Sequence, residues 1–474
     1  MFSNVLTRAT VILLALTVPG PSLAFAEAFR IIHAFDNASG AAVPYSSIIR
    51  KDGWLYGTTT FTNYGSSKNY PPELRVDGGA VFKLRPDGTG FQVIKQFATS
   101  ESASGYAPFQ GLTVAGDALV GTLMSGGANS RGTLYSVGMD GSSFRVLHDF
   151  GGTGDGTHAY AAPVVVGSVL YGTTGFGGAN PGGGEYPSLG AGVLYSYNLT
   201  TSSYRVERNF SSPGSTSFGA LTQVGDWLYG MVADHRNQAE HGQVFRYRPS
   251  DQAYEVIHEF TGGHGGGYPY DSLVFDGGHY LYGTTLGYYP FLPLSPSEIA
   301  AIQDEGVIFR IDLAMALSDP LQYQVLHDFS LATGDGAKPN SSMLVAPDGF
   351  LYGIAHGSES FGGTFNGVRY GTEFGTLYRL HPDGSDFSVL HTFDSVEAGL
   401  TPMRGLVWEN GTIYGTTAEG GTSITLGGGL TSRGSGTVWS YEVYSVPEPS
   451  TLLILAGGGI MAWRFRPRRS ERTC

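Results

Sequence analysis

Cysteine is almost absent from the sequence. The single cysteine, Cys474, is the last of the 474 residues. No internal disulfide and no cysteine-based zinc site can therefore form. A chain of this length buries enough surface to fold without disulfides, which chiefly stabilise very small domains.

Charged residues are also scarce. They make up 14% of the chain, against about 25% in an average soluble domain, and the formal net charge is −13. This acidic balance argues against a nucleic-acid partner. Aromatic residues make up 13% of the chain, whereas disordered chains are poor in them. The composition therefore indicates a folded protein.

Sequence signatures of common enzymes are missing. No Gly-x-Ser-x-Gly elbow, His-Glu-x-x-His helix, phosphate loop or dinucleotide fingerprint occurs. We therefore predict no catalytic residues, no metal site and no cofactor. Calcium stays open, because Asp155 and Asp335 lie in Gly-Asp-Gly turns and, with Asp36, offer carboxylate oxygens. Ordinary turn chemistry explains such Asp-Gly pairs without a metal.

Glycine, in contrast, is abundant, with 72 residues. Each glycine in a helix interior costs roughly 1 kcal/mol, which argues against a helical bundle. No strict three-residue period is present, so the chain is not collagen-like. Many short strands joined by glycine-rich turns remain, as in a sandwich, barrel or propeller.

The N-terminus has the pattern of a secretory signal. Arg8 precedes an apolar run from Ala9 to Val18, and Ala24 and Ala26 form a small-x-small cleavage site. The run is too short to span a membrane. We predict that residues 1–26 are a signal peptide removed by signal peptidase.

The C-terminus combines three features in a fixed order. Pro447-Glu448-Pro449 is followed by an apolar stretch from Thr451 to Trp463 and then by a cluster of arginines: Arg464, Arg466, Arg468, Arg469 and Arg472. The stretch is a weak stop-transfer element that would anchor the chain transiently, with its arginines on the cytoplasmic side. The combination resembles the PEP-CTERM sorting signal of bacteria. This resemblance implies an exosortase that cuts near residues 447–449 and delivers the protein to the envelope surface or extracellular matrix; a retained anchor is the alternative.

Residues 27–446 repeat three sequence elements seven times. Leu-Tyr-Gly-Thr-Thr and looser copies begin at Leu55, Leu119, Leu170, Leu228, Leu281, Leu351 and Ile413. A Gly-x-hydrophobic-aromatic element follows each copy, beginning at Gly79, Gly132, Gly192, Gly242, Gly306, Gly375 and Gly436. A Val-Leu-His-Asp-Phe-like element ends at Phe35, Phe97, Phe150, Phe210, Phe260, Phe329 and Phe393. Internal repeats of this length are typical of solenoids and propellers.

Each repeat contains four strands. The three elements alternate like strands, and a fourth strand precedes each Leu-Tyr-Gly, as at Ser272–Phe275. Tight turns such as Pro86-Asp87-Gly88 join them as hairpins. Seven units of four antiparallel strands predict an all-β fold, a seven-bladed β-propeller. A β-solenoid is the alternative, although its repeats are usually shorter.

The phase of the repeat predicts how the ring closes. We name the strands of a unit A, B, C and D, with Leu-Tyr-Gly in B and His-x-Phe in D. The chain begins with a D strand, Phe29–Phe35, and ends with a C strand, Gly436–Tyr441. The N-terminal strand can therefore complete the last blade and remove two exposed strand edges.

These repeats resemble the GloVer-type tandem repeat family. The resemblance covers residues 29–441 and rests on Leu-Tyr-Gly-Thr-Thr, the Gly-Thr-hydrophobic-Tyr strand and the Phe-x-Val-Leu-His-x-Phe strand. It implies an exported surface or secreted repeat protein and no defined reaction. Leu119-Val-Gly-Thr-Leu and Leu228-Tyr-Gly-Met-Val depart most from the motif.

The longest connections fall on one side of the predicted disc. Five of the seven B–C connections are long: Thr60–Gly78, Gly175–Ala191, Leu286–Glu305, His356–Phe374 and Ala418–Ser435. Binding residues often lie on loops held by a rigid scaffold. Neutral drift of loop length is the alternative.

Aromatic residues on these loops are the candidate ligand contacts, because exposed rings suit the apolar faces of sugars. The alternative is that the rings pin the loops onto the blades. The candidates are Phe61, Tyr64, Tyr70, Phe176, Tyr186, Tyr288, Tyr289, Phe361, Phe365 and Tyr370.

A histidine recurs in the D strands. His33, His148, His258, His327 and His391 share one position, which Lys95 and Arg208 fill in the other two copies. A position spread around the ring cannot converge on one metal, so we expect these side chains to hydrogen-bond between neighbouring blades.

The sequence as a whole predicts an exported, sorted propeller that acts as a non-catalytic binding or structural module, with exopolysaccharide as the expected ligand. An extracellular glycan-degrading enzyme is one alternative, and buried carboxylates at the mouth of the central channel would favour it. A protein-binding adhesin is the other.

Overall fold

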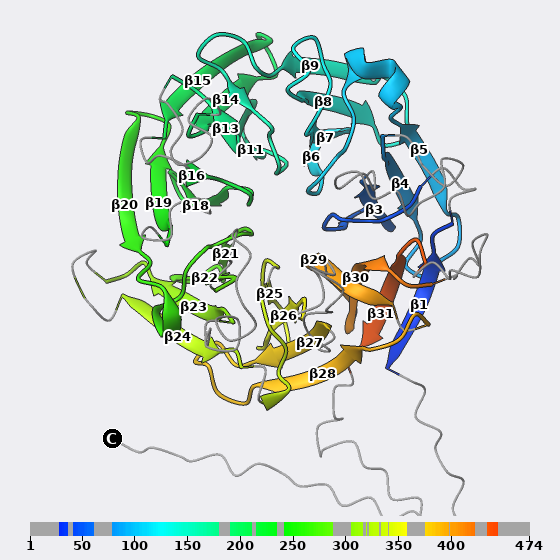
Figure 1. Cartoon of the computed structure of the whole chain (residues 1–474), viewed down its shortest axis with the longest axis vertical. Helices are drawn as coiled ribbons and strands as arrows, with labels where there is room; N and C mark the ends of the chain where they lie inside the picture. Colours follow the sequence, from blue (N-terminus) through cyan, green and yellow to red (C-terminus); the bar gives the residue numbers. More distant parts are fainter. Residues whose placement is uncertain are drawn as a thin grey trace, which may run out of the picture.

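The repeats fold into seven antiparallel sheets arranged as blades around a central axis (Figure 1). This computed structural model describes residues 28–443 except 37–40, 61–77, 180–189, 211–214, 235–240, 288–304, 316–318, 320–321, 331–332, 340, 358–374, 398 and 422–433. The chain is a seven-bladed β-propeller, as predicted.

Each blade uses four strands, which follow one another from the axis outward. Blade 1 holds β2 (Ile49–Lys51), β3 (Trp54–Thr59), β4 (Ala80–Leu84) and β5 (Gln92–Gln96); blade 2 holds β6 (Thr113–Ala115), β7 (Ala118–Leu123), β8 (Thr133–Gly138) and β9 (Arg145–Asp149); blade 3 holds β11 (Val164–Val166), β12 (Val169–Thr173), β14 (Val193–Asn198) and β15 (Ser203–Asn209); blade 4 holds β17 (Thr222–Val224), β18 (Trp227–Asp234), β19 (Gln243–Arg248) and β20 (Ala253–Glu259). Blade 5 holds β21 (Val274–Phe275), β22 (Tyr280–Thr284), β23 (Val307–Asp312) and β24 (Tyr323–Asp328); blade 6 holds β25 (Leu344–Val345), β26 (Leu351–Ala355), β27 (Gly375–Leu380) and β28 (Ser388–Phe393); blade 7 holds β29 (Leu400–Glu409), β30 (Thr412–Glu419), β31 (Thr437–Glu442) and β1 (Phe29–Ala34).

A few short elements lie outside the blades. β10 (Gly156–Thr157) pairs with β13 (Phe176–Gly177), and β16 (Ser215–Thr216) adds to β18. Two 3-10 helices, η3 (Thr99–Ser104) and η5 (Gly263–Gly265), follow the outer strands of blades 1 and 4.

The ring closes as the phase of the repeat predicted. β1, from the N-terminus, pairs antiparallel with β31 as the outermost strand of blade 7, with Phe29 opposite Tyr441 and Ala34 opposite Thr437. The backbone N–H of Glu442 also donates to the carbonyl of Ala28 at 2.7 Å. The last blade is therefore held together by strand pairing between the two ends of the propeller.

The glycine of each Leu-Tyr-Gly makes room for an aromatic ring. A Cβ built on Gly57 would lie 2.5 Å from Cζ of Phe82, the residue paired with it on the adjacent C strand. The same close approach occurs in every blade, at the pairs Gly121–Tyr135, Gly172–Tyr195, Gly230–Phe245, Gly283–Phe309, Gly353–Tyr378 and Gly415–Trp439. The first two repeated elements are therefore two halves of one packing unit.

The phenylalanine that ends each D element packs across the junction between blades. Phe35 contacts Phe82 edge-to-face, with ring centroids 5.1 Å apart. The six other junctions repeat this contact at 5.3–5.5 Å: Phe97–Tyr135, Phe150–Tyr195, Phe210–Phe245, Phe260–Phe309, Phe329–Tyr378 and Phe393–Trp439. The hydrophobic core is divided in the same way, since each of its seven clusters spans two neighbouring blades.

The recurring D-strand histidine was predicted to hydrogen-bond between blades, and it stacks on a ring of the next blade. His148 and His327 also hydrogen-bond, to carboxylates of the connections that lead to the next blade. His148 lies parallel to Tyr204 at 3.6 Å, and Arg208 lies 3.7 Å from the ring centre of Tyr254. The other junctions have the same arrangement: His33–Phe91, Lys95–Phe144, His258–Tyr323, His327–Phe387 and His391–Phe29. Lysine and arginine fill this position in two copies because a cation, like a stacked imidazole, packs favourably over an aromatic face.

Burial has a clear effect on two of these histidines, His258 and His391. It lowers the pKa of His258 to about 4, and likewise that of His391, although the charge of Asp394 opposes the shift at His391. The rings are therefore neutral in the folded protein near pH 7.

Candidate ligand-binding face

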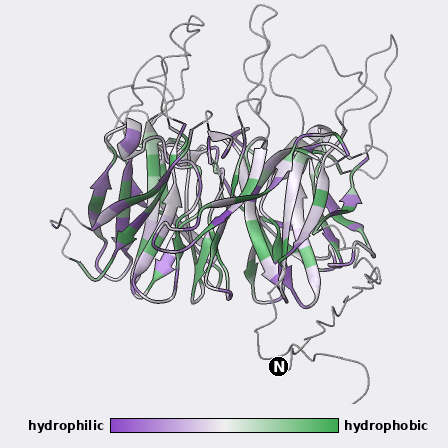
Figure 2. Cartoon of the chain, turned by 90° about the horizontal axis from the view of Figure 1, so that it is seen from below, coloured by the Kyte–Doolittle hydropathy of each residue, from purple (hydrophilic) through white to green (hydrophobic). Residues whose placement is uncertain are grey.

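One face of the disc carries all the B–C and D–A connections. In antiparallel blades the B strands end, and the A strands begin, at the same edge, and Figure 2 shows the strands running across the thickness of the disc. We call this edge the loop face. The five long B–C connections all begin and end on it.

Most of the predicted ligand contacts lie outside the described residues. This holds for Phe61, Tyr64, Tyr70, Tyr186, Tyr288, Tyr289, Phe361, Phe365 and Tyr370. It also holds for the processing residues Ala24, Ala26, Pro447, Glu448, Pro449, Arg464, Arg466, Arg468 and Arg469. These assignments stay predictions, as does the division at residues 26 and 446.

Phe176 is the candidate that the structure describes. It lies in β13, which pairs with β10. Its half-buried ring meets His158 edge-on at 5.6 Å and Tyr160 at 6.3 Å. This ring therefore packs a B–C connection against a D–A connection. Such packing agrees with the alternative that the aromatic rings pin the loops onto the blades.

An arc of aromatic rings lies around the axis on the loop face. Tyr45, Phe109, Tyr160, Phe218 and Tyr270 stand just before the inner strands of blades 1 to 5, and each touches the next. The centroid distances in this order are 5.4, 5.3, 4.8 and 4.2 Å. Phe109 is buried, whereas the other four rings are half-buried.

The arc was not predicted from the sequence, although a signal for it exists. Three of the five rings follow a proline and precede the first buried apolar residue of the A strand by three positions, as in Pro44-Tyr45, Pro108-Phe109 and Pro269-Tyr270. Loop length, the stronger signal, pointed to the B–C connections instead.

Arg404 joins the arc from the opposite side of the ring. It lies in β29 of blade 7, and its guanidinium carbon is 4.9 Å from the ring centres of both Phe109 in blade 2 and Tyr270 in blade 5. Because blades 2 and 5 lie on different sides of the ring, contacts with both place the guanidinium near the axis. Its side chain is 1% exposed.

A carboxylate accompanies this arginine. Asp271 Oδ2 lies 3.9 Å from Arg404 Nη1, which is an ion pair too long for a hydrogen bond. Asp271 Oδ1 accepts from Ser272, through its backbone N–H at 2.7 Å and its hydroxyl at 3.2 Å. Asp271 is held in position by its own A strand and directs its second oxygen towards the axis.

Several polar groups near the axis are buried. Desolvation, helped by the charges of Arg404 and Lys338, lowers the pKa of His356 to about 3. Desolvation also lowers the pKa of Lys338, and Glu305 opposes that shift. Two of the cations, Arg404 and Lys338, are thus each accompanied by a carboxylate, Asp271 and Glu305 respectively.

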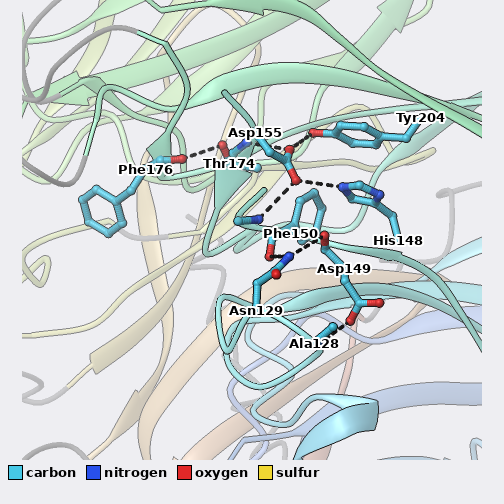
Figure 3. A network of polar contacts seen from close by, with 11 residues as sticks. Ala128, Asn129, His148, Asp149, Phe150, Asp155, Thr174, Phe176 and Tyr204 are labelled. Atoms are coloured by element: carbon cyan, nitrogen blue, oxygen red, sulfur yellow. Dashed lines mark hydrogen bonds and ion pairs between the residues drawn. The ribbon is translucent and has the colours of Figure 1, made fainter. Parts of the chain in front are cut away.

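Asp155, one of the carboxylates considered for calcium, is the centre of a hydrogen-bond network (Figure 3). It accepts from His148 Nε2 at 2.8 Å, from the Gly151 N–H at 3.1 Å and from the Tyr204 hydroxyl. Asp335 accepts in the same way from His327 Nε2 at 2.9 Å and from Ser330. These carboxylates tie D–A connections to the outer strands.

No group of three or more His, Cys, Asp or Glu side chains in the described part of the chain is arranged to hold a metal ion. Four aspartates there are buried: Asp155, Asp271, Asp312 and Asp335. Of these, Asp271 lies at the axis. The predictions of no catalytic residue and of no cofactor are not tested by this arrangement.

Comparison with known families identifies both the repeats and the tail. A model of the Gloeobacter/Verrucomicrobia repeat matches residues 62–289, and a model of the PEP-CTERM protein-sorting motif matches residues 445–469. The sorting motif indicates export across the inner membrane and exosortase-mediated delivery to the surface or matrix. Within the described residues no helix is long and apolar enough to cross a membrane; the predicted segment 451–463 lies outside them.

Solved structures with a similar fold include enzymes. A prolyl endopeptidase is 12% identical, with a TM-score of 0.46 over 85% of this chain and 51% of that chain. An oligogalacturonate lyase in complex with manganese is 10% identical, with a TM-score of 0.45 over 77% and 85%. The chain spans about half the length of the prolyl endopeptidase. These similarities are too distant to indicate an activity, and no curated protein matches the chain significantly.

Proposed function

We propose that this chain, a propeller of Gloeobacter/Verrucomicrobia repeats with a PEP-CTERM sorting motif, is a non-catalytic module that binds polysaccharide at the cell surface or in the extracellular matrix. The binding surface is the loop face. The arc of Tyr45, Phe109, Tyr160, Phe218 and Tyr270 is the observation that supports this proposal.

The chemistry of the arc suits a sugar chain. Aromatic rings offer flat apolar surface together with a quadrupole, and tyrosine adds a hydroxyl at its polar end. Four of the five rings are half-buried, so each keeps part of its surface for a ligand while its backbone is fixed by a blade. Rings held on a rigid scaffold lose little entropy on binding.

The test uses residues 27–446, which contain the whole closed ring. This protein is passed over immobilised exopolysaccharide of the producing organism and over a panel of neutral and acidic glycans, and both retention and release of reducing ends are recorded. We expect retention without release. Cleavage would replace the binding proposal with an enzymatic one, and absence of retention on every glycan would refute it.

Variants locate the surface. Phe218→Ala removes a half-buried ring of the arc that stacks on Tyr270 at 4.2 Å, and we expect its retention to fall about tenfold or more, since one ring face contributes about 1–3 kcal/mol to stacking on a flat ligand. Trp227→Ala is the matched control. That half-buried ring lies at the A–B turn on the opposite face, under Arg246 and Arg248, and its loss is expected to leave retention unchanged.

A further inference from the structure

Arg404 and Asp271 form an incompletely satisfied polar pair at the axis. Within the described residues Arg404 Nε, Nη1 and Nη2 are buried and have no hydrogen-bond partner. Asp271 Oδ2 likewise accepts no hydrogen bond there. Gln110 Nε2 is a third such group, on the residue that follows Phe109, over whose ring Arg404 lies.

This arrangement is costly for the folded protein. A buried charged group loses its hydration, and an ion pair compensates for this loss only with good geometry and further hydrogen bonds. The two aromatic faces around the guanidinium, each 4.9 Å away, compensate for part of it. Buried polar groups in native proteins are almost always paired, and each exception calls for an explanation such as a functional role or a bound water or ion.

The unpaired groups include both hydrogen-bond donors and an acceptor, and this limits the class of ligand that could bind them. Arg404 and Gln110 can only donate through the atoms named, whereas Asp271 Oδ2 can only accept. A sugar hydroxyl does both. A hydroxyl oxygen about 2.8 Å from each partner spans the 3.9 Å gap between Arg404 Nη1 and Asp271 Oδ2.

The local charge argues against an anionic ligand. Arg404 is balanced by Asp271, and Lys338 by Glu305, so neither of these cations carries an uncompensated positive charge. A carboxylate bound to Arg404 would lie beside Asp271 and be repelled by it. A neutral hydroxyl carries no such penalty.

We propose that Arg404, Asp271 and Gln110 form a subsite for one neutral sugar residue of the bound polysaccharide. Its hydroxyls accept from Arg404 and Gln110 and donate to Asp271, while its apolar face lies on Phe109 or Tyr270. Because the Arg404 side chain is 1% exposed, only a chain end or a branch residue reaches it. This subsite rests on the proposed function, since it gives the arc its specificity.

The test compares two conservative variants with the Phe218→Ala arc variant. Asp271→Asn keeps the shape of the side chain but removes its negative charge and replaces one carboxylate oxygen with an amide nitrogen. Arg404→Lys keeps the positive charge but loses the planar guanidinium. The affinity of residues 27–446 for the glycans retained by the unmodified protein is measured by titration calorimetry, with free methyl glycosides of neutral hexoses and of glucuronic acid as competitors. Thermal unfolding of each variant is recorded in parallel.

We expect both variants to weaken binding about 10- to 100-fold, as for loss of one hydrogen bond to a charged group. A neutral methyl glycoside should compete, and the glucuronide should compete less well. If Arg404→Lys does not fold, Asp271→Asn and the competition experiment decide.

The outcomes separate the subsite from the proposed function. Binding by Asp271→Asn at wild-type affinity, while Phe218→Ala is weakened, would overturn the subsite and leave the arc in place. A glucuronide that competes better than its neutral counterpart would also overturn it. If the unmodified protein binds no glycan at all, the proposed function fails and the subsite fails with it.

Discussion

The junction between β1 and blade 6 tests how the ring is held closed. Phe29 stacks on His391 at 3.8 Å and contacts Phe393 and Trp439 at 5.6 and 5.7 Å. It belongs to the strand that joins the two ends of the propeller. The Phe29→Ala variant should therefore release β1 from blade 7 before the rest of the ring opens.

The magnitude follows from the packing of the ring. Truncating a fully buried Phe to Ala costs about 3–5 kcal/mol, and Phe29 is half-buried. Half of that cost, together with about 0.5–1.5 kcal/mol for the stacked pair, amounts to about 2–4 kcal/mol. Local opening of β1 should then be about 30- to 900-fold more frequent.

Native-state amide hydrogen exchange measures this opening directly. Phe144→Ala is the matched control, because Phe144 meets Lys95, Phe97 and Tyr135 at the corresponding position. The strand that it directly precedes, β9, is joined to the chain on both sides. Exchange should accelerate selectively in β1 for Phe29→Ala and much less in β9 for the control. Equal acceleration in the two strands would refute the reasoning that non-covalent closure makes β1 the weak point.

Two further predictions concern the interior of the ring. His258 and His391 have folded pKa values of about 4 because they are buried, against about 6.5 when unfolded. The unfolded state therefore binds more protons below pH 6.5, and the urea midpoint of unfolding should fall as the pH is lowered from 7.5 to 5.5. The fall should be shallower in the His258→Phe variant, and a rise of the midpoint would contradict this prediction. Gly353→Ala places a Cβ 2.3 Å from Tyr378 Oη, and should therefore lower the free energy of unfolding by about 1–3 kcal/mol. Adding Tyr378→Leu should restore part of this stability. Strictly additive effects of the two substitutions would contradict the steric explanation.

The fold could be predicted from the sequence alone, including the number of blades and the way the ring closes. This was possible because each blade is specified by short-range signals. A glycine opposite an aromatic residue, a hairpin turn and an alternating strand recur within one repeat, and neighbouring blades bury the same phenylalanine. The PEP-CTERM signal is equally local, since its three parts lie in order within residues 447–474.

The groups at the axis could be found only in the folded ring. Phe109, Tyr270 and Arg404 belong to blades 2, 5 and 7, and nothing in their local sequence relates one to another. The curvature of the closed ring brings them together, because every inner strand begins at the same edge around one axis. The recurring histidine shows the same limit. Its position in the strand could be predicted from the sequence. Its stacking on the next blade could not, because it depends on the distance between two outer strands, and the packing between blades determines that distance.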